Sequence, residues 1–248
     1  MENLIKKAAK DLAKSNKVVA LTGAGVSVES GIPPFRGKGG IWEKIDPMEF
    51  AHIDSFMRDP AKVWNILIRE MKDVIENAKP NSAHKGLARL EELGILNSII
   101  TQNVDGLHQL AGNTDVIEFH GTFALQRCLK CEKKIETSKV SLKEIPPKCE
   151  CGGILRPDCV FFGEMIPQKH LFRSKKISQE CDIMLVVGTS AVVYPASNIP
   201  IDAKNSGAKI IEINPENTPL TGSISDYIIR GNAGEVIKKI VSEVELLL

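Results

Sequence analysis

Short, mostly apolar runs alternate with segments of helical periodicity along much of the chain. The runs are KVVALT (17–22), LNSIIT (96–101), DVIEF (115–119), DIMLVVG (182–188) and AKIIEIN (208–214), and each is typical of a buried parallel strand. NSAHKGLARLEELG (81–94) has helical spacing and stops at Gly94, and NAGEVIKKIVSEVELLL (232–248) predicts a closing helix. Strands that alternate with helices predict an α/β fold with a doubly wound parallel sheet, which binds ligands at the carboxyl ends of its strands.

Two segments interrupt this alternation. Residues 38–80 lack an obvious strand and include DPAKVWNILIREMKDVIENA (59–78), in which Val63, Ile66, Leu67 and Val74 suit a packed helix. The second interruption, about 122–157, carries four of the six cysteines. We therefore expect a small lobe built from insertions 38–80 and 122–157, and a large domain built from 1–37, 81–121 and 158–248.

The charge of the chain excludes some classes of partner. Its 32 basic and 31 acidic side chains give a net charge of +1, so no electrostatic footprint for nucleic acid or an anionic membrane exists. The N-terminal MENLIKKAAKDLAKSN mixes charged and apolar residues and does not resemble a signal peptide, and no run of about 18 apolar residues occurs. We expect a soluble cytoplasmic protein. The sequence leaves the oligomeric state open, with a monomer as the expectation.

The clustered cysteines form two closely spaced pairs. Two residues separate Cys128 from Cys131, 17 residues lie between the two pairs, and one residue separates Cys149 from Cys151. In a reducing cytoplasm such pairs favour metal binding over disulfides, and four thiolates in a tetrahedron suit a structural zinc ion. A redox dithiol is the alternative, but it needs one Cys-x-x-Cys at a helix start, and this segment is irregular and rich in lysine. The remaining Cys159 and Cys181 are expected in the core.

The first strand is followed by TGAGVSVESGIPPFRG (22–37). Gly23 and Gly25 allow close backbone approach to a diphosphate, and Ser27 can begin a helix whose amides favour anions. The segment is neither a full G-x-G-x-x-G fingerprint, because position 28 is valine, nor a P-loop, so an ordinary turn stays open. Phe35 and Arg36 lie on a Gly/Pro-bounded loop that is typical of a flap over a ligand.

Polar residues follow the next two strands. Gln102, Asn103 and Asp105 need hydrogen-bond partners, which ribose hydroxyls and a carboxamide would supply; alternatively, Asp105 caps a helix. His120 lies in EFHG (118–121), just before Gly121, and could accept a proton near neutral pH. A structural role is the alternative for any lone histidine, and it is the interpretation for the four others, His52, His84, His108 and His170.

Three further stretches carry candidate binding residues. GTSAVVYP (188–195) begins with a small polar loop, Gly188, Thr189 and Ser190, that suits a phosphate. In INPE (213–216), the polar side chains at 214 and 216 could bind ribose hydroxyls. VFFGE (160–164) could add a strand to a peptide or could be an ordinary edge strand.

Taken in order, GAGVSVESGIPPFRG, TQNVDGLHQLAG, FHG, the two cysteine pairs, VFFGE, GTSAVVYP and INPE closely resemble the motifs of the sirtuins, which are NAD-dependent protein lysine deacylases. The resemblance spans about residues 18–234, and the length is similar to that of prokaryotic and archaeal members with a single catalytic domain. It implies a Rossmann-like large domain and a small zinc-binding lobe, with NAD and an acyl-lysine peptide in the cleft between them.

The resemblance also implies roles for individual residues. His120 and Asn103 would be catalytic, and the zinc ligands would be Cys128, Cys131, Cys149 and Cys151. The substrate peptide would contact Val160, Phe161, Phe162 and Gly163. NAD would contact Gly23, Ala24, Gly25, Ser27, Ile32, Phe35, Arg36, Gln102, Asn103, Val104, Asp105, Gly188, Thr189, Ser190, Asn214, Pro215, Glu216 and Ala233.

The implied reaction moves an acyl group from lysine to ADP-ribose and releases nicotinamide. His120 would remove a ribose hydroxyl proton, which lets that oxygen attack the acyl carbon. Sirtuins that prefer succinyl or malonyl lysine carry Tyr-x-x-Arg where this chain has Ile66-x-x-Arg69, so we expect acetyl or longer apolar acyl groups. The alternatives are mono-ADP-ribosyl transfer and a non-catalytic module that binds NAD or ADP-ribose. A zinc-ribbon protein that binds nucleic acid is the alternative that the neutral net charge favours least.

Overall fold

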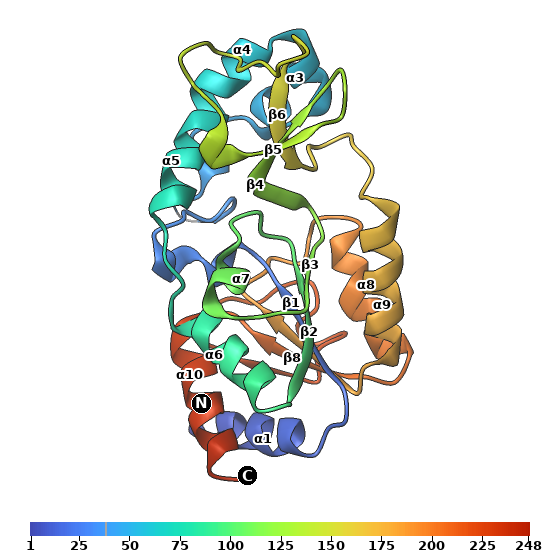
Figure 1. The fold of residues 1–248 in the computed structure, drawn as a ribbon. Helices are drawn as coiled ribbons and strands as arrows, with labels where there is room; N and C mark the ends of the chain where they lie inside the picture. Colours follow the sequence, from blue (N-terminus) through green and yellow to red (C-terminus); the bar gives the residue numbers. More distant parts are fainter. Residues whose placement is uncertain (38) are drawn as a thin grey trace.

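A six-stranded parallel sheet forms the centre of the larger of two lobes in the computed structural model, which describes residues 1–37 and 39–248 (Figure 1). The strand order is β3-β2-β1-β7-β8-β9, and every neighbouring pair is parallel. The strands are β1 (Val18–Thr22), β2 (Leu96–Thr101), β3 (Val116–Glu118), β7 (Ile183–Val187), β8 (Lys209–Ile213) and β9 (Tyr227–Ile229). The chain runs outward in both directions from β1, so the sheet has a topological switch point beside that strand.

The sheet confirms the predicted α/β class and the five strands expected from the sequence. Both faces of its central strands are apolar: Val18 and Ala20 pack on one side, and Val19 and Leu21 pack on the other. This double burial explains why these strands read as continuous apolar runs. The edge strand β9 was not predicted, because it has three residues and two of them are only half-buried.

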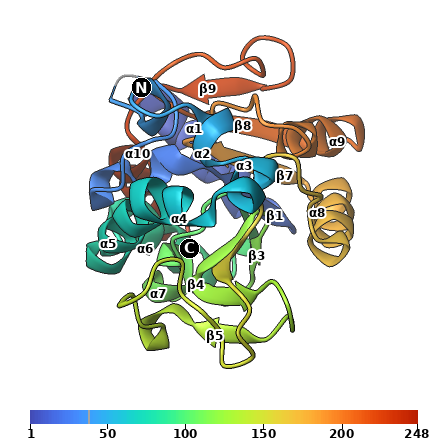
Figure 2. The ribbon, with the colours of Figure 1, turned by 90° about the horizontal axis from the view of Figure 1, so that it is seen from above.

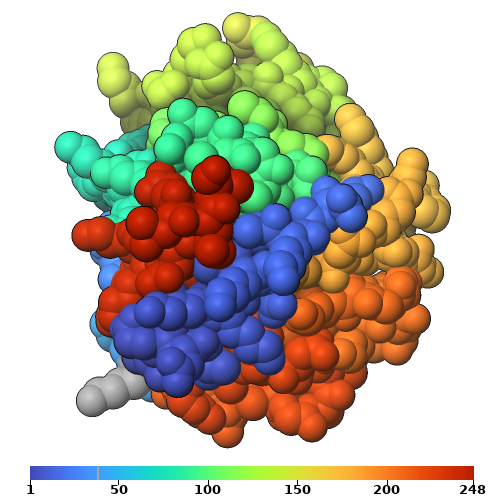
Figure 3. All heavy atoms as spheres, turned by 90° about the horizontal axis from the view of Figure 1, so that it is seen from below, coloured from blue at the N-terminus to red at the C-terminus, as the bar shows by residue number. Residues whose placement is uncertain are grey.

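Helices cover both faces of the sheet. One face carries α1 (Glu2–Ala13), α6 (Ser82–Glu92) and α10 (Ala233–Glu245), and the other carries α8 (Gln168–Glu180) and α9 (Ile199–Asn205) (Figure 1). Figure 3 shows α1 in blue beside α10 in red, so the two ends of the chain share one side of the molecule. Within the described ranges, no helix combines the length and the hydropathy needed to cross a membrane.

The smaller lobe combines short helices with a three-stranded antiparallel sheet. The helices are α2 (Pro47–Phe50), α3 (Ile53–Arg58), α4 (Pro60–Val63) and α5 (Arg69–Asn77), and the sheet order is β5-β4-β6. Its strands are β4 (Gly121–Cys128), β5 (Lys134–Glu136) and β6 (Leu155–Cys159). Figure 2 looks down on this lobe. A shared core joins the helices to the sheet, with Phe56, Trp64 and Phe161 at its centre. The domain boundaries expected from the sequence remain predictions, and residue 38, the first of the helical insertion, lies outside the described residues.

The long helix expected over 59–78 is divided by one π-helical turn, Trp64–Ile68, between α4 and α5. The wider turn changes which side chains face inward. Leu67 and Ile68 are buried, whereas Ile66, which we expected in the core, is 36% exposed. A pattern read at 3.6 residues per turn cannot anticipate this change, and such turns are frequent at functional sites.

Candidate active site

A cavity of about 720 Å³ lies at the carboxyl ends of the central strands and reaches the small lobe. Its wall contains most of the residues singled out from the sequence. These are Gly23, Ala24, Gly25, Phe35, Arg36, Gln102, Asn103, Val104, His120, Val160, Phe161, Phe162, Gly163, Gly188, Thr189, Ser190, Asn214, Pro215, Glu216 and Ala233. Segments that are distant in sequence therefore meet at one cavity, as the strand ends of a parallel sheet predict.

The loops after β1 and β7 pack backbone against backbone. The Gly25 amide donates to the Gly188 carbonyl at 2.8 Å, and a Cβ atom on Gly25 would lie 2.7 Å from that oxygen. Gly188 itself has a φ of +59°, in the left-handed region. A side chain at residue 25 would push the two loops apart, so glycine there keeps the floor of the cavity closed.

The α-helix expected to begin at Ser27 is absent from this described segment. Two short 3₁₀ turns, Ala24–Val26 and Val28–Ser30, take its place. Gly31 has a φ of +87°, and the proline pair that follows cannot continue a helix. The amides of Gly23, Gly25, Val26 and Ser27 all donate to backbone carbonyls. The anion-binding helix N-terminus predicted here is therefore wrong.

A buried polar chain connects Asn103, Ser27 and Asp105. The Asn103 Nδ2 atom donates to Ser27 Oγ at 3.0 Å, and Ser27 Oγ donates to Asp105 Oδ2 at 2.7 Å. Burial raises the pKa of the Asp105 carboxyl, although hydrogen bonds from the Leu107 amide, Ser27 and Asn103 act in the opposite direction. The Leu107 amide also donates to Asp105 Oδ1 at 2.9 Å, but the N-cap of the helix that follows, α7 (Leu107–Ala111), is Gly106, so Asp105 does not occupy the cap position considered as its alternative role.

Three predicted residues face a second, smaller cavity. Ser27, Ile32 and Asp105 line a space of about 20 Å³. It adjoins the large cavity, because Phe35, Asn103 and other residues line both. Asp105 and Asn103 of the buried polar chain therefore line a small compartment beside the main cavity, and Phe35 lines both spaces.

Two histidines lie in the core beneath this chain. The His84 and His108 rings are 4.9 Å apart between centroids, and His108 Nε2 lies 2.9 Å from Thr22 Oγ1. His84 Nδ1 accepts from the Asn81 amide at the start of α6. Burial lowers the pKa of His84 to about 4 and that of His108 to about 3. Both rings are neutral near pH 7, which agrees with the structural interpretation made from the sequence, although His108 Nδ1 is buried and makes no hydrogen bond to the described residues.

His120 lies on the cavity wall, in the short connection between β3 and β4. Its Nδ1 atom is 3.1 Å from the carbonyl oxygen of Gln102. A carbonyl only accepts hydrogen bonds, so Nδ1 carries the proton and Nε2 is the basic atom of the neutral ring. Burial lowers the pKa of His120, although the bond to Gln102 acts in the opposite direction.

Side-chain bonds tie the far end of the cavity together. Gln102 Nε2 donates to Thr189 Oγ1 at 2.9 Å, and Asn214 Nδ2 donates to the Thr189 carbonyl at 2.8 Å. The buried carboxylate of Glu212 accepts from Thr218 and Thr221, which shapes the loop after β8. This polar end also contains Val192, Val193, Tyr194, Asn217, Thr218, Pro219 and Asn232, which the sequence reading missed.

Residues Val160–Gly163 lie outside the named strands and end in a turn at Gly163, whose φ is +84°. The Val160 amide donates to the His120 carbonyl at 2.8 Å. Phe162 pairs with the small lobe, because its amide donates to Ala51 and its carbonyl accepts from Ile53, both at 2.9 Å. Cys159, which precedes this segment, is half-buried: it packs against the core of the small lobe and also lines the cavity, so its expected place in the core is confirmed only in part.

The small-lobe end of the cavity is apolar. Trp42, Leu67, Ile68, Met71 and Phe123 line it; the sequence pointed to Leu67 as a packed helix residue, but none of the five was predicted to line a cavity. Their spacing could have identified a buried helix face, but it could not show that this face meets a cavity. Ile66 and Arg69, the expected counterpart of Tyr-x-x-Arg, are exposed and lie outside the cavity wall.

The side chains of the four clustered cysteines converge in the small lobe, in an arrangement that could hold a metal ion. Their sulfur atoms all lie within 4.8 Å of one another, with Cys128 and Cys151 at 3.5 Å and Cys131 and Cys149 at 3.8 Å. A tetrahedron with Zn–S bonds of about 2.3 Å places its sulfurs about 3.8 Å apart, which agrees with these distances. A Cβ atom on Gly153 would lie 2.6 Å from Cys128 Sγ, so the chain needs glycine to pass this close. The cluster fits a structural zinc ion.

Comparisons with known proteins agree with this geometry. The Sir2 family model matches residues 23–195. The NAD-dependent protein deacylase 1 of Archaeoglobus fulgidus is 49% identical over 242 residues, which cover 96% of this chain and 97% of that protein. A crystal structure of a Sir2 homologue in complex with NAD has a TM-score of 0.90 and 47% identity, covering 97% of this chain and 94% of that one. A Sir2 protein bound to a myristoylated histone peptide has a TM-score of 0.82 and 39% identity, covering 100% and 98% of the two chains. The chain described here belongs to the Sir2 family.

Proposed function

We propose that this protein is an NAD-dependent protein lysine deacylase that moves the acyl group of an acyl-lysine to ADP-ribose. The observation that carries the proposal is the place of His120 in the cavity. Polar strand ends and loops line one side of it, and an apolar surface of the small lobe lines the other. Such a cavity can hold a dinucleotide and an acyl chain on either side of one base. Family membership and the names of the relatives support the same activity.

The polar part of the cavity would bind NAD, which is the co-substrate that provides the acyl acceptor. Gly23 and Gly25 would let the backbone approach its diphosphate, and Arg36 would supply a positive charge. Gln102 would meet the ribose nearest nicotinamide, and the 188–190 and 214–216 loops and Ala233 would meet the adenosine half. The compartment containing Asp105 would receive the carboxamide.

His120 would act as the general base. Its neutral ring offers Nε2 as proton acceptor, because the carbonyl of Gln102 holds the proton on Nδ1. A hydroxyl deprotonated in this way becomes a nucleophile toward the acyl carbon. Asn103, fixed by Ser27, would orient the same ribose. The depressed pKa keeps the ring unprotonated at neutral pH.

The acyl-lysine would enter along Val160–Gly163, with its acyl group toward the apolar end of the cavity. Leu67, Ile68 and Met71 offer that end no charged group. Burying a carboxylate there without a partner would be unfavourable. We therefore propose acetyl and longer apolar acyl groups as the preferred substrates.

Mass spectrometry of the purified chain with NAD and an acetyl-lysine peptide tests this proposal. The expected products are unmodified peptide, nicotinamide and O-acetyl-ADP-ribose. An ADP-ribosylated protein or peptide with its acetyl group retained would indicate mono-ADP-ribosyl transfer instead. No conversion by zinc-loaded protein would indicate a binding module. Either result would contradict the proposal.

A further inference from the structure

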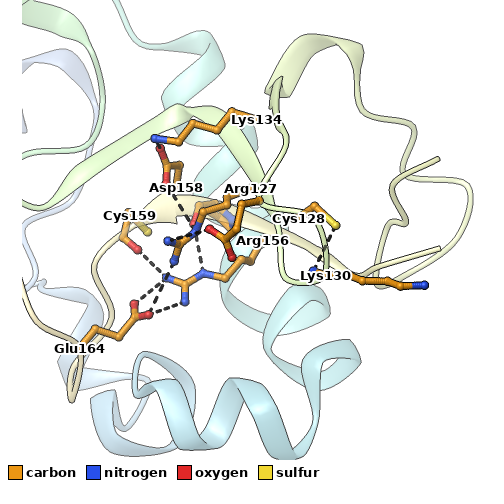
Figure 4. Close-up of polar contacts among 10 residues, drawn as sticks. Arg127, Cys128, Lys130, Lys134, Arg156, Asp158, Cys159 and Glu164 are labelled. Atoms are coloured by element: carbon orange, nitrogen blue, oxygen red, sulfur yellow. Dashed lines mark hydrogen bonds and ion pairs between the residues drawn. The ribbon is translucent and has the colours of Figure 1, made fainter. Parts of the chain in front are cut away.

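Arg156 carries the most buried positive charge in the small lobe. It lies on β6 and is 0% exposed, and its guanidinium donates four hydrogen bonds. Nη1 and Nη2 donate to the two carboxylate oxygens of Glu164 at 2.8 and 2.7 Å. Nη2 also donates to the Cys159 carbonyl at 2.5 Å, and Figure 4 shows the guanidinium pointing toward both partners. The planar fork of arginine suits this bidentate arrangement, which lysine cannot reproduce.

These bonds close the chain from 156 to 164 on itself. The Phe161 amide donates to Glu164 Oε2 at 2.9 Å, so the carboxylate links Arg156 to the middle of the segment. The guanidinium also lies over the Phe161 ring, 4.3 Å from its centroid. Burial alone would raise the pKa of Glu164, but the bonds from Arg156 and the Phe161 amide bring it below its ordinary value.

The segment that these bonds hold lines the cavity and has little regular structure of its own. Its other backbone bonds are the Val160 amide to His120, the Phe162 pairing with Ala51 and Ile53, and the Glu164 amide to the Phe161 carbonyl at 3.1 Å. Without Glu164, the Phe161 amide would lose its acceptor. The path of the segment between its two outer attachments would then no longer be fixed.

We propose that Arg156 and Glu164 are positioning residues for the acyl-lysine substrate: as a buried pair they set the path of Val160–Gly163, against which the substrate peptide lies. The inference rests on the proposed function. A purely stabilising role explains the pair less well, because buried ion pairs contribute little net stability compared with apolar residues of the same volume. The fork of Arg156 instead imposes a particular shape, since it binds the Cys159 carbonyl and Glu164 at once.

The nearby charges provide a matched control. Lys134 pairs with Asp158 at 2.7 Å at the outer edge of the same cluster (Figure 4). Arg127 lies between the two pairs, 3.7 Å from Asp158 and 3.9 Å from Glu164. Replacing Lys134 therefore perturbs the electrostatics of the cluster while leaving the hydrogen bonds of Val160–Gly163 in place.

Steady-state kinetics separate positioning from general damage. For Glu164→Gln we expect the KM for an acetyl-lysine peptide to rise about tenfold, since one charge-assisted bond network is weakened. The KM for NAD should stay unchanged, and Lys134→Gln should alter neither constant. Binding of a fluorescein-labelled acetyl-lysine peptide, measured by anisotropy with ADP-ribose present, should weaken in parallel. Equal rises in both KM values, or no change for the peptide, would overturn the inference.

A double variant covers the case in which a single change unfolds the lobe. Arg156→Met with Glu164→Leu removes both buried charges together, so its thermal stability should exceed that of Arg156→Met alone. Peptide affinity should nevertheless remain about tenfold weaker than in the parent protein, because the Phe161 amide still lacks its acceptor. Parent-like peptide affinity in the double variant would refute the positioning role. A parent protein without any deacylase activity would instead contradict the proposed function.

Discussion

The ring of His120 donates its Nδ1 proton to the backbone carbonyl of Gln102, 3.1 Å away. The acceptor belongs to the residue that directly follows β2, and the donor lies between the end of β3 at Glu118 and the start of β4 at Gly121. Two adjacent strand ends therefore fix both the orientation and the tautomer of the ring. Because the acceptor is a backbone atom at the end of a strand, the position of the sheet strands determines that Nε2 is the basic atom of the ring.

Replacing His120 with alanine should abolish turnover while leaving the fold intact. Loss of a general base typically lowers kcat by about 10²–10⁴-fold. The four cysteines lie elsewhere in the small lobe, so the zinc content should not change. Product formation by mass spectrometry and metal content by atomic absorption check both statements. An active variant would show that another group accepts the proton.

Acid should destabilise the protein through its two buried core histidines. The pKa of His84 is lowered from 6.5 to about 4, and that of His108 from 6.5 to about 3. Above pH 6.5 the rings are neutral in both the folded and the unfolded state and contribute no pH dependence. As the pH falls below 6.5, only the unfolded chain binds the protons, so the free energy of unfolding should drop by up to about 1.4 kcal/mol per pH unit for each ring.

Denaturant titrations between pH 7.5 and pH 5.5 measure this slope before most carboxyl groups titrate. A His170→Gln variant keeps both buried rings and should show the same slope as the parent protein. A constant free energy of unfolding over this range would mean that the two rings bind protons as readily in the folded protein as in the unfolded one.

Acyl preference should follow the apolar end of the cavity. A succinyl carboxylate beside Leu67 and Met71 would lose its hydration without gaining a partner from that helix, so kcat/KM should fall on the order of 100-fold relative to acetyl-lysine. Matched peptides that differ only in the acyl group test this directly. Faster hydrolysis of the succinyl peptide would contradict the assignment of this end of the cavity.

The same surface offers a paired mutational test. Met71→Ala should enlarge the apolar end and shift the preference toward longer acyl chains. Ile66→Ala lies five residues earlier, is 36% exposed and should leave the preference unchanged. A shift produced by Ile66→Ala but not by Met71→Ala would show that the π-helical turn has been assigned the wrong phase.

Removal of zinc should disorganise the small lobe before the large one. Only a small apolar cluster, centred on Leu155, packs around the cysteines, so it cannot hold the 128–151 hairpin without the metal. Chelator treatment should release one zinc ion per chain, abolish activity and lower the Tm, and Cys131→Ser should reproduce these effects. Full activity in protein shown to be metal-free would exclude a structural role for zinc.

The sequence was informative where structure depends on local pattern. The buried strands, the polar residues at their ends and the spacing of the cysteines are local features, and the sheet and the cysteine cluster appear as expected. The helix predicted at Ser27 failed because its hydroxyl binds Asp105, 78 residues away in sequence, while Gly31 and the prolines turn the chain. Local propensity cannot include such a distant partner.

The residues at the apolar end of the cavity could not be predicted from the hydrophobic periodicity of the sequence. One π-helical turn decides that Leu67 faces inward and Ile66 outward. Likewise, the path of Val160–Gly163 depends on Ala51 and Ile53, more than 100 residues earlier in the sequence. These contacts require the two lobes to be packed together, so only the three-dimensional structure identifies them.

The central claim is that His120 stands beside the bond between nicotinamide and ribose. A crystal structure of the protein with NAD and an acetyl-lysine peptide, prepared with His120→Asn to slow turnover, measures this most directly. The account predicts that the ribose next to nicotinamide lies within hydrogen-bonding reach of the residue 120 side chain, with the acetyl group toward Met71. A dinucleotide bound with that ribose far from residue 120 would contradict it.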